Sequence, residues 1–442
     1  MLKRPESGGG TVIPQISMGD AAFPAPFASG LEYSAPARGG WTIVHVGMLV
    51  PEAHEIFVCA AGCLRGVVLS AAEMNLAERF STIAIEEPNV LEGDMERLMI
   101  DGVTDILNRL PKLPPAVLLY TSCIHHFMGC DLELCYRVLR ERFPQVDFTD
   151  CYMIPTMRKS GLTPDQIMRR QLYSLLPEGM TKGKVCTVLG NCFPTEDSSD
   201  LVRLVRGAGF ELREITRCET YAEYKALGES SVYITTQPVA KAGGEALATR
   251  LGGLHLYSPM CYGTEEIRKH MGTLAKALGT SYDGGKDAEK AAAEALARAR
   301  AVIGDTPIVL DYSVTPRPLG LARLLLEHGF RVERLYADSF VGEERADYDW
   351  LREHAPELQV LPTVHPAMRR ARQEGEFSCL ALGQKAAYFT NSRHFVNLVE
   401  GGGLYGFDGI RMLAELMIEA YERESDVETL IQIKGLGCES CI

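Results

Sequence analysis

Short apolar, β-prone segments alternate with amphipathic helical segments along most of this chain. The cycle begins after the first forty residues, restarts at residues 184–189 and restarts again at residues 307–310. Such alternation is typical of parallel sheets that are covered by helices on both faces. The sequence therefore predicts an α/β protein of three similar units in series with parallel sheets, whose similarity is architectural because no repeat is visible at the residue level.

Changes in composition mark the predicted domain boundaries. The first forty residues are rich in Gly, Pro, Ala and Ser and have no lasting period, so we expect an irregular N-terminal arm. The rest divides into a first domain that carries the clustered cysteines, a second domain and a third domain with a flexible tail. The predicted boundaries are 1–40, 41–181, 182–303 and 304–442.

Three local patterns give more specific expectations. Residues 41–46 are the first strand candidate, and residues 91–110 repeat apolar side chains at about 3.6-residue spacing, which predicts one helix. The Ala-, Lys- and Glu-rich helix at 287–302 is expected to be a solvated connector. The glycine-rich stretch at 401–409 lacks the lysine of a phosphate-binding loop, so no nucleotide is assigned to this chain.

Length and charge restrict the class of protein. A chain of 442 residues that is 46% hydrophobic is expected to form two or three domains. A net charge of −13 without a basic block argues against nucleic acid and anionic membranes as partners. The sequence has neither a signal-peptide core nor about 18 consecutive apolar residues, so we expect a cytoplasmic protein with reduced thiols. Its thirteen cysteines are then buried small residues, metal ligands or redox groups.

Cysteines gather where the strands of the first domain are predicted to end. Cys59 and Cys63 follow one apolar stretch, and Cys123 follows the buried strand predicted at 116–120. The carboxyl ends of parallel strands meet at one edge of a sheet, where thiolates can converge on an iron-sulfur cluster. The alternative is that these cysteines only pack against the sheet. We expect Cys59, Cys63 and Cys123 to bind a metal cofactor.

Other residues of this region have weaker signals. His125 and His126 are candidates for metal binding or proton donation, although adjacent histidines point in different directions and one of them is expected to be structural. Cys130 and Cys135 lie beside or on a helix and are expected to be buried small residues unless a cluster is near. The C-terminal pair of Cys438 and Cys441 is a redox pair, a labile metal clip, or neither.

The order of these motifs resembles a known family. The motifs are Gly62-Cys63, the acidic segment 89–94, Thr121-Ser-Cys123 with Met128-Gly-Cys-Asp131 after it, and Gly406-Phe-Asp-Gly409. The chain is similar from about residue 42 to residue 421 to the component 1 subunits of nitrogenase and its relatives. Those relatives include light-independent protochlorophyllide reductase and nickel-sirohydrochlorin reductive cyclase. Their three Rossmann-like domains match the three cycles of this sequence.

The resemblance implies a cofactor and partners. Component 1 proteins hold an iron-sulfur cluster near a subunit interface, here a 4Fe-4S cluster or a larger one. Cys63 and Cys123 match two of the family's ligands, whereas its earlier cysteine has no counterpart, so that either Cys59 replaces it or fewer ligands come from this chain. The expected partners are a second copy or a paralogous subunit, in a dimer or heterotetramer, and a reductase that resembles the nitrogenase iron protein. MgATP is expected to act only through that reductase.

Two departures from the family pattern bear on the reaction. Residues 232–238 lack the cysteine that ligates the nitrogenase cofactor, and Tyr405 replaces the corresponding histidine. The resemblance therefore implies an oxidoreductase subunit that reduces a small-molecule or tetrapyrrole-like substrate other than N2. The alternatives are a scaffold or carrier for metallocofactor assembly and a hinged binding protein without a redox role. The last of these would leave Cys63 and Cys123 unexplained.

Overall fold

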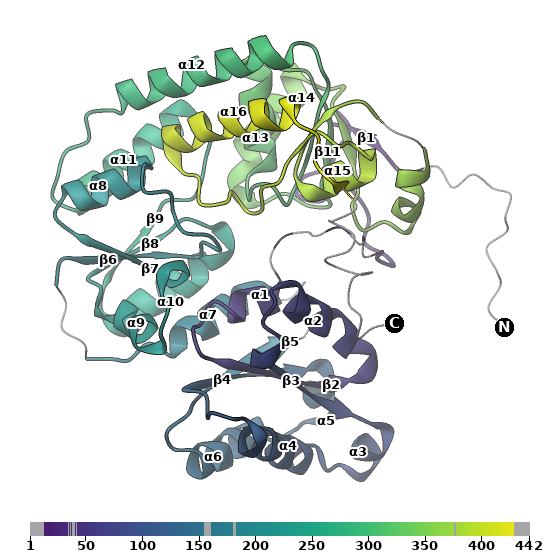
Figure 1. The fold of residues 1–442 in the computed structure, drawn as a ribbon, viewed down its shortest axis with the longest axis vertical. Coiled ribbons are helices and arrows are strands. Elements are labelled where there is room, and N and C mark those ends of the chain that lie inside the picture. Colours follow the sequence, from purple (N-terminus) through teal and green to yellow (C-terminus); the bar gives the residue numbers. More distant parts are fainter. Residues whose placement is uncertain are drawn as a thin grey trace, which may run out of the picture. The chain divides into compact units, whose positions relative to one another are not determined.

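The computed structural model describes residues 13–33, 35, 37, 40, 42–153, 161–179, 183–374 and 377–427. Trp41, Cys438 and Cys441 lie outside these residues. Helices alternate with strands along the chain, and the strands form three sheets (Figure 1). The sequence thus correctly predicts an α/β protein with parallel sheets. The chain divides into two compact units, one with the first two sheets and one with the third.

The first sheet is entirely parallel, in the order β3-β2-β4-β5. Side chains of alternate residues on β2 and β4 enter two different cores, as a strand buried on both faces requires. Phe57, Cys59 and Tyr120 pack on the side of α2 and α7, and Val58 and Leu119 on the side of α4 and α6 (Figure 1). The elements are β2 (His54–Ala60), α2 (Ala61–Glu73), β3 (Phe80–Ile85), α4 (Met95–Arg109), β4 (Ala116–Ser122), α5 (Cys123–Met128), α6 (Leu132–Arg142), β5 (Asp147–Met153) and α7 (Pro164–Ser174).

The second sheet is also parallel, in the order β7-β6-β8-β9. It shares a hydrophobic core with the first sheet, because Tyr224, Tyr233 and Leu247 belong to the same cluster of buried residues as Phe57 and Tyr120. The elements are β6 (Val185–Leu189), α8 (Asp200–Gly207), β7 (Glu211–Glu214), α9 (Tyr221–Ala226), β8 (Val232–Thr235), α10 (Lys241–Leu251), β9 (Leu254–Tyr257) and α11 (Thr264–Ala277).

The third sheet has the order β1-β12-β11-β10-β13-β14, and only β1 runs antiparallel. The arm before the first domain thus contributes an edge strand to the chain's own third sheet. Phe23 of the arm also contacts Phe340 and Tyr348. The elements are β1 (Ile16–Ser17), α12 (Lys286–Ile303), β10 (Ile308–Asp311), α13 (Pro318–Glu327), β11 (Val332–Tyr336), α14 (Arg345–His354), β12 (Gln359–Leu361), β13 (Leu380–Leu382), α15 (Gln384–Thr390), β14 (Phe395–Val396) and α16 (Gly406–Glu422).

Three local expectations were wrong. Residues 43–47 form a short helix, α1 (Ile43–Gly47), because Thr42 and His45 make a capping box that outweighs the β-branched composition. The helix expected at 91–110 is two helices, α3 (Glu87–Glu92) and α4, separated by Gly93 at φ +69°. The helix expected to be a solvated connector, α12, buries Ala295, Leu296 and Ala299 and packs along α16.

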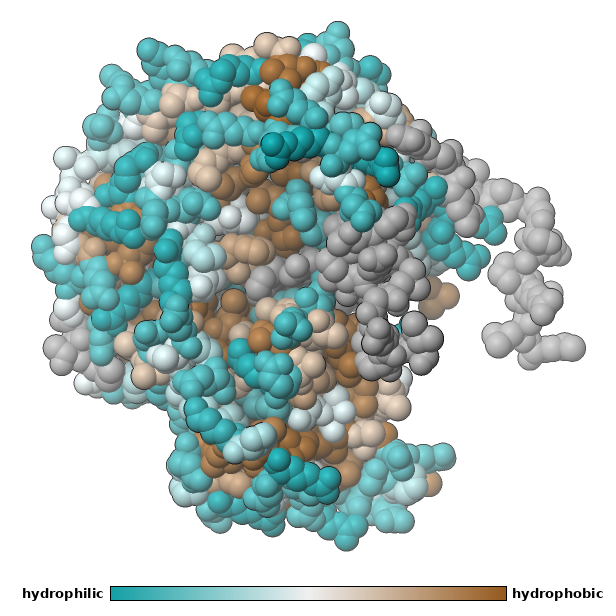
Figure 2. Space-filling model, in the orientation of Figure 1, coloured by the Kyte–Doolittle hydropathy of each residue, from teal (hydrophilic) through white to brown (hydrophobic). Residues whose placement is uncertain are grey.

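The exposed surface is largely hydrophilic in the view of Figure 2. Hydrophilic residues cover much of the face seen in Figure 2, with smaller apolar patches between them. Among the residues that the structure describes, no helix combines the length and the apolar character needed to cross a bilayer.

Candidate functional site

The predicted cysteines lie at the ends of two neighbouring strands. Cys59 is the penultimate residue of β2, and Cys63 lies in the first turn of α2, which follows β2 without a loop. Cys123 is the first residue of α5, directly after β4. Because β2 and β4 pair in parallel, with Val58 opposite Thr121, the three cysteines come to the same edge of the sheet.

The three thiols are close enough to influence one another. Burial raises the pKa of Cys59 to about 12, and the charges of Cys63 and Cys123 raise it as well. Cys63 is exposed and Cys123 is partly buried, whereas Cys59 is fully buried. Without a cation the Cys59 thiol therefore stays protonated at neutral pH. A thiophilic metal would remove this penalty, since it compensates the charge of neighbouring thiolates. This donor set fits an iron-sulfur cluster.

The start of α2 leaves its first turn open. Ala60, the N-cap residue, makes no side-chain hydrogen bond to the first turn. Ala61, Gly62 and Cys63 are exposed there. The N-terminal end of this 13-residue helix favours negative charge. The start of α2 thus presents the Cys63 sulfur, a soft metal ligand, beside backbone N–H groups that the N-cap side chain does not bond.

The two candidate histidines have different environments. Nδ1 of His125 accepts a hydrogen bond from the backbone N–H of Ser122 at 3.2 Å, so this ring caps α5. His125 is buried, and burial lowers its pKa, which keeps the ring neutral. Its Nε2 atom makes no hydrogen bond within the described residues. His126 is exposed, and so are Phe127 at 69% and Met128 at 45%. His125 is therefore the structural histidine of the two.

A buried acid lies on the same face of the first sheet as Cys59, and the sequence analysis missed it. Tyr120 Oη is 3.1 Å from the carbonyl oxygen of Ile43 and 3.2 Å from Glu55 Oε1. A phenol has one hydrogen, which Tyr120 Oη shares between the Ile43 carbonyl and Glu55 Oε1. Burial raises the pKa of Glu55 well above its usual value and so favours the neutral carboxylic acid, although the hydrogen bond from Tyr120 acts in the opposite direction. The available signal was a glutamate inside an otherwise apolar strand.

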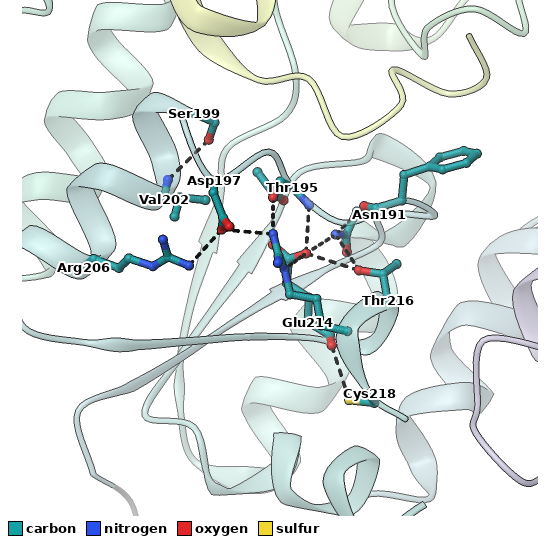
Figure 3. A network of polar contacts seen from close by, with 11 residues as sticks. Asn191, Thr195, Asp197, Ser199, Val202, Arg206, Glu214, Thr216 and Cys218 are labelled. Atoms are coloured by element: carbon teal, nitrogen blue, oxygen red, sulfur yellow. Dashed lines mark hydrogen bonds and ion pairs between the residues drawn. The ribbon is translucent and has the colours of Figure 1, made fainter. Parts of the chain in front are cut away.

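The carboxyl edge of the second sheet is filled by the chain's own polar network (Figure 3). Glu214, the last residue of β7, is 1% exposed. Its Oε2 atom accepts hydrogen bonds from Asn191 Nδ2 at 3.1 Å, Thr195 N at 2.9 Å and Thr216 Oγ1 at 3.2 Å. In dinucleotide-binding domains an acidic residue at a similar position binds the ribose. Here that carboxylate holds the loop after β6 instead.

The sequence and the fold identify the family. A family model of nitrogenase component 1 type oxidoreductases matches residues 44–420. The chain belongs to the nitrogenase component 1 family. It is accordingly an oxidoreductase of the component 1 type, and the predicted resemblance is confirmed. No curated protein sequence matches the chain.

Solved structures of component 1 proteins share the fold. A structure of nitrogenase Cp1 at pH 6.5 superposes with a TM-score of 0.67 at 15% identity, over 90% of this chain and 94% of that chain. A structure of nitrogenase Cp1 at pH 5 gives a TM-score of 0.55 at 11% identity, over 89% of this chain and 90% of that chain. At these identities the similarity concerns the fold alone, and it confirms the predicted fold class.

The two departures from the component 1 pattern lie within regular structure. The strand β8 has the sequence Val-Tyr-Ile-Thr and is fully buried, so no thiol projects from it. Tyr405 is the N-cap residue of α16 and is 6% exposed. Neither β8 nor position 405 therefore carries a cysteine or a histidine.

Proposed function

We propose that this chain is an iron-sulfur subunit of a nitrogenase-like reductase. The observation that carries the proposal is the placement of Cys59, Cys63 and Cys123 at one sheet edge in a component 1 chain. Cys63 and Cys123 supply thiolates from helix starts, and Cys59 supplies a third from the buried strand. A bound iron-sulfur cluster supplies one-electron transfer. His126, with its exposed ring, is the better candidate for donating a proton to a substrate.

The proposed substrate is a small molecule or a tetrapyrrole-like compound, and N2 is not proposed. Support comes from Tyr405 and from β8, which replace the histidine and cysteine expected for a nitrogenase cofactor. Without those ligands, a substrate would be held by side chains of the protein and reduced by electrons from the cluster. We place this reaction in the cytoplasm, where the thiols stay reduced.

We propose a dimer, with a second copy or with a paralogous subunit, that covers the exposed start of α2. Three thiols from one chain leave part of a cluster unligated, and Cys63 lies in an open turn. Light scattering on the anaerobically purified protein should give the mass of a dimer or heterotetramer that loses its iron when diluted to monomers. A monomer that retains its full iron content would contradict this proposal.

Electrons should arrive from a separate ATP-dependent protein that resembles the nitrogenase iron protein. The decisive experiment mixes this protein with the iron protein encoded nearest to it, adds MgATP and dithionite, and follows the cluster spectrum. Reduction that requires both the partner and ATP is expected. The reduction rate should fall as salt rises, because exposed charges are screened beyond roughly 10 Å at 0.1 M salt and this chain carries a net charge of −13.

The second candidate function is a scaffold or carrier in metallocofactor assembly. The missing cofactor ligands at β8 and Tyr405 are compatible with it, because a carrier needs to release its cargo. Equally fast reduction by dithionite alone, with no ATP-dependent complex at any salt concentration, would favour the scaffold over the reductase.

A further inference from the structure

Two cysteines outside the proposed cluster site face each other at the start of α6. Cys130 immediately precedes the N-cap residue Asp131, and Cys135 is the fourth residue of the helix. Asp131 Oδ1 accepts a hydrogen bond from Leu134 N at 2.9 Å, which fixes this helix start. In helices that begin in this way, the side chains before the cap and at the fourth position pack on each other. Here both of those side chains are thiols.

Cys130 and Cys135 both adjoin one hydrophobic core, and both lie near Glu96. Each thiol is close enough to influence the pKa of the other, and the charge of Glu96 acts on both. Cys135 Sγ lies 4.0 Å from the Glu96 carbonyl oxygen. Glu96 Oε1 accepts a hydrogen bond from Asp131 N at 2.7 Å, so α4 holds the start of α6 in place. The start of α6, which carries both cysteines, is therefore held against α4 by these contacts to Glu96.

The two thiols differ in access to solvent. Cys135 is fully buried, whereas Cys130 is partly exposed. A small disulfide can thus reach Cys130 first, and Cys135 can then displace it from inside the protein. This division between an accessible and a resolving thiol is the arrangement that thiol–disulfide exchange requires.

We propose that Cys130 and Cys135 form a reversible disulfide with glutathione disulfide as the oxidant. Cys130 loses its proton as its sulfur attacks one sulfur of glutathione disulfide, which forms a mixed disulfide and releases one glutathione thiolate. The Cys135 thiolate then attacks the Cys130 sulfur and releases the second. Two protons pass from the cysteines to the two glutathione thiolates, so the protein loses two electrons and two protons and the oxidant becomes two glutathione molecules.

The disulfide would act on the helix that carries Cys123. Cys130 N donates to the carbonyl oxygen of His125 at 3.0 Å, so the residue before α6 is tied to α5. Bringing the sulfurs to a bond length of about 2.05 Å requires movement, and Cys135 is held within α6. The movement therefore falls on the connection at Cys130 and on the end of α5. This inference does not depend on the proposed cluster, because both thiols lie outside its candidate ligands.

The test uses the purified full-length protein in anaerobic glutathione buffers that range from fully reduced to fully oxidised. After the free thiols are blocked with N-ethylmaleimide, the protein is cleaved before aspartate residues, which separates Cys130 from Cys135 at Asp131. Mass spectrometry should show the two peptides joined in oxidised buffer and separate in reduced buffer. Separate peptides at every glutathione ratio, in protein that circular dichroism shows to be folded, would overturn the proposal.

Variants distinguish this disulfide from others. Cys135→Ser should accumulate one glutathione on Cys130, because the resolving thiol is gone, and Cys130→Ser should give neither the adduct at Cys135 nor the joined peptides. Cys186→Ala, which removes a buried thiol of β6, is the matched control and should behave like the unmodified protein. Joined peptides that persist in Cys130→Ser would show that another cysteine, such as Cys123, is the partner and would refute the pairing.

Discussion

Glu55 shows how burial can set the protonation state of an acidic side chain in the core. The residue is fully buried, and burial raises its pKa well above the usual value, which favours a neutral carboxylic acid. A charge there would lose several kcal/mol of hydration, which one phenol hydroxyl does not replace. The protein therefore holds a proton on the face of the first sheet that also carries Cys59.

A neutral Glu55 predicts that glutamine can replace it. At pH 6 and at pH 8, Glu55→Gln should be more stable than Glu55→Ala by about 2–4 kcal/mol, because the amide can donate to Tyr120 and leaves no cavity. The raised pKa also means that the unfolded chain releases this proton before the folded one does. Stability should fall as pH rises from 6 to 8, and Glu55→Gln should reduce that fall. Urea denaturation at both pH values measures this, and equal losses for the Gln and Ala variants would contradict it.

At the scale of elements, α12 shows how a helix with many charged residues can be part of a core. Leu296 is 2% exposed in the packing of α12 with α16, while Val302 of the same helix is 40% exposed. Leu296→Ala should lower the free energy of unfolding by about 2–4 kcal/mol, because it removes buried methyl groups and leaves a cavity. Val302→Ala should change it by less than about 1 kcal/mol. Similarly small changes in the free energy of unfolding for both variants would instead indicate that α12 is a solvated connector.

The elements that the sequence predicts well are those whose pattern is local. The buried strand β4 follows from its apolar run. The start of α7 also has a local signal, because Thr163 and Gln166 form a capping box and Pro164 is the first helical residue. The helix α1 was missed because its capping box competes with a β-branched composition. The burial of α12 was missed because it depends on α16, more than a hundred residues further along the chain.

At the scale of the whole molecule, the candidate site was predictable where it follows from strand order. Cys59, Cys63 and Cys123 lie at strand ends that a parallel sheet brings together. The pairing of Cys130 with Cys135 was only partly visible, because it depends on the exact cap residue of α6, although the spacing around Asp131 was available. The protonation of Glu55 was not predictable, because it depends on burial in a core to which Tyr120, 65 residues away, belongs.

The proposed function depends on three thiols of the first sheet that together hold an iron-sulfur centre. The most direct measurement is iron and acid-labile sulfide in protein made and purified without oxygen, for the natural sequence and for Cys63→Ala, Cys123→Ala and Cys186→Ala. The natural protein should be brown, with iron and sulfide in near-equal amounts. Cys63→Ala and Cys123→Ala should lose both, while Cys186→Ala keeps them with a packing loss of about 1 kcal/mol. A folded, active and iron-free protein, or equal iron loss in all three variants, would contradict the account.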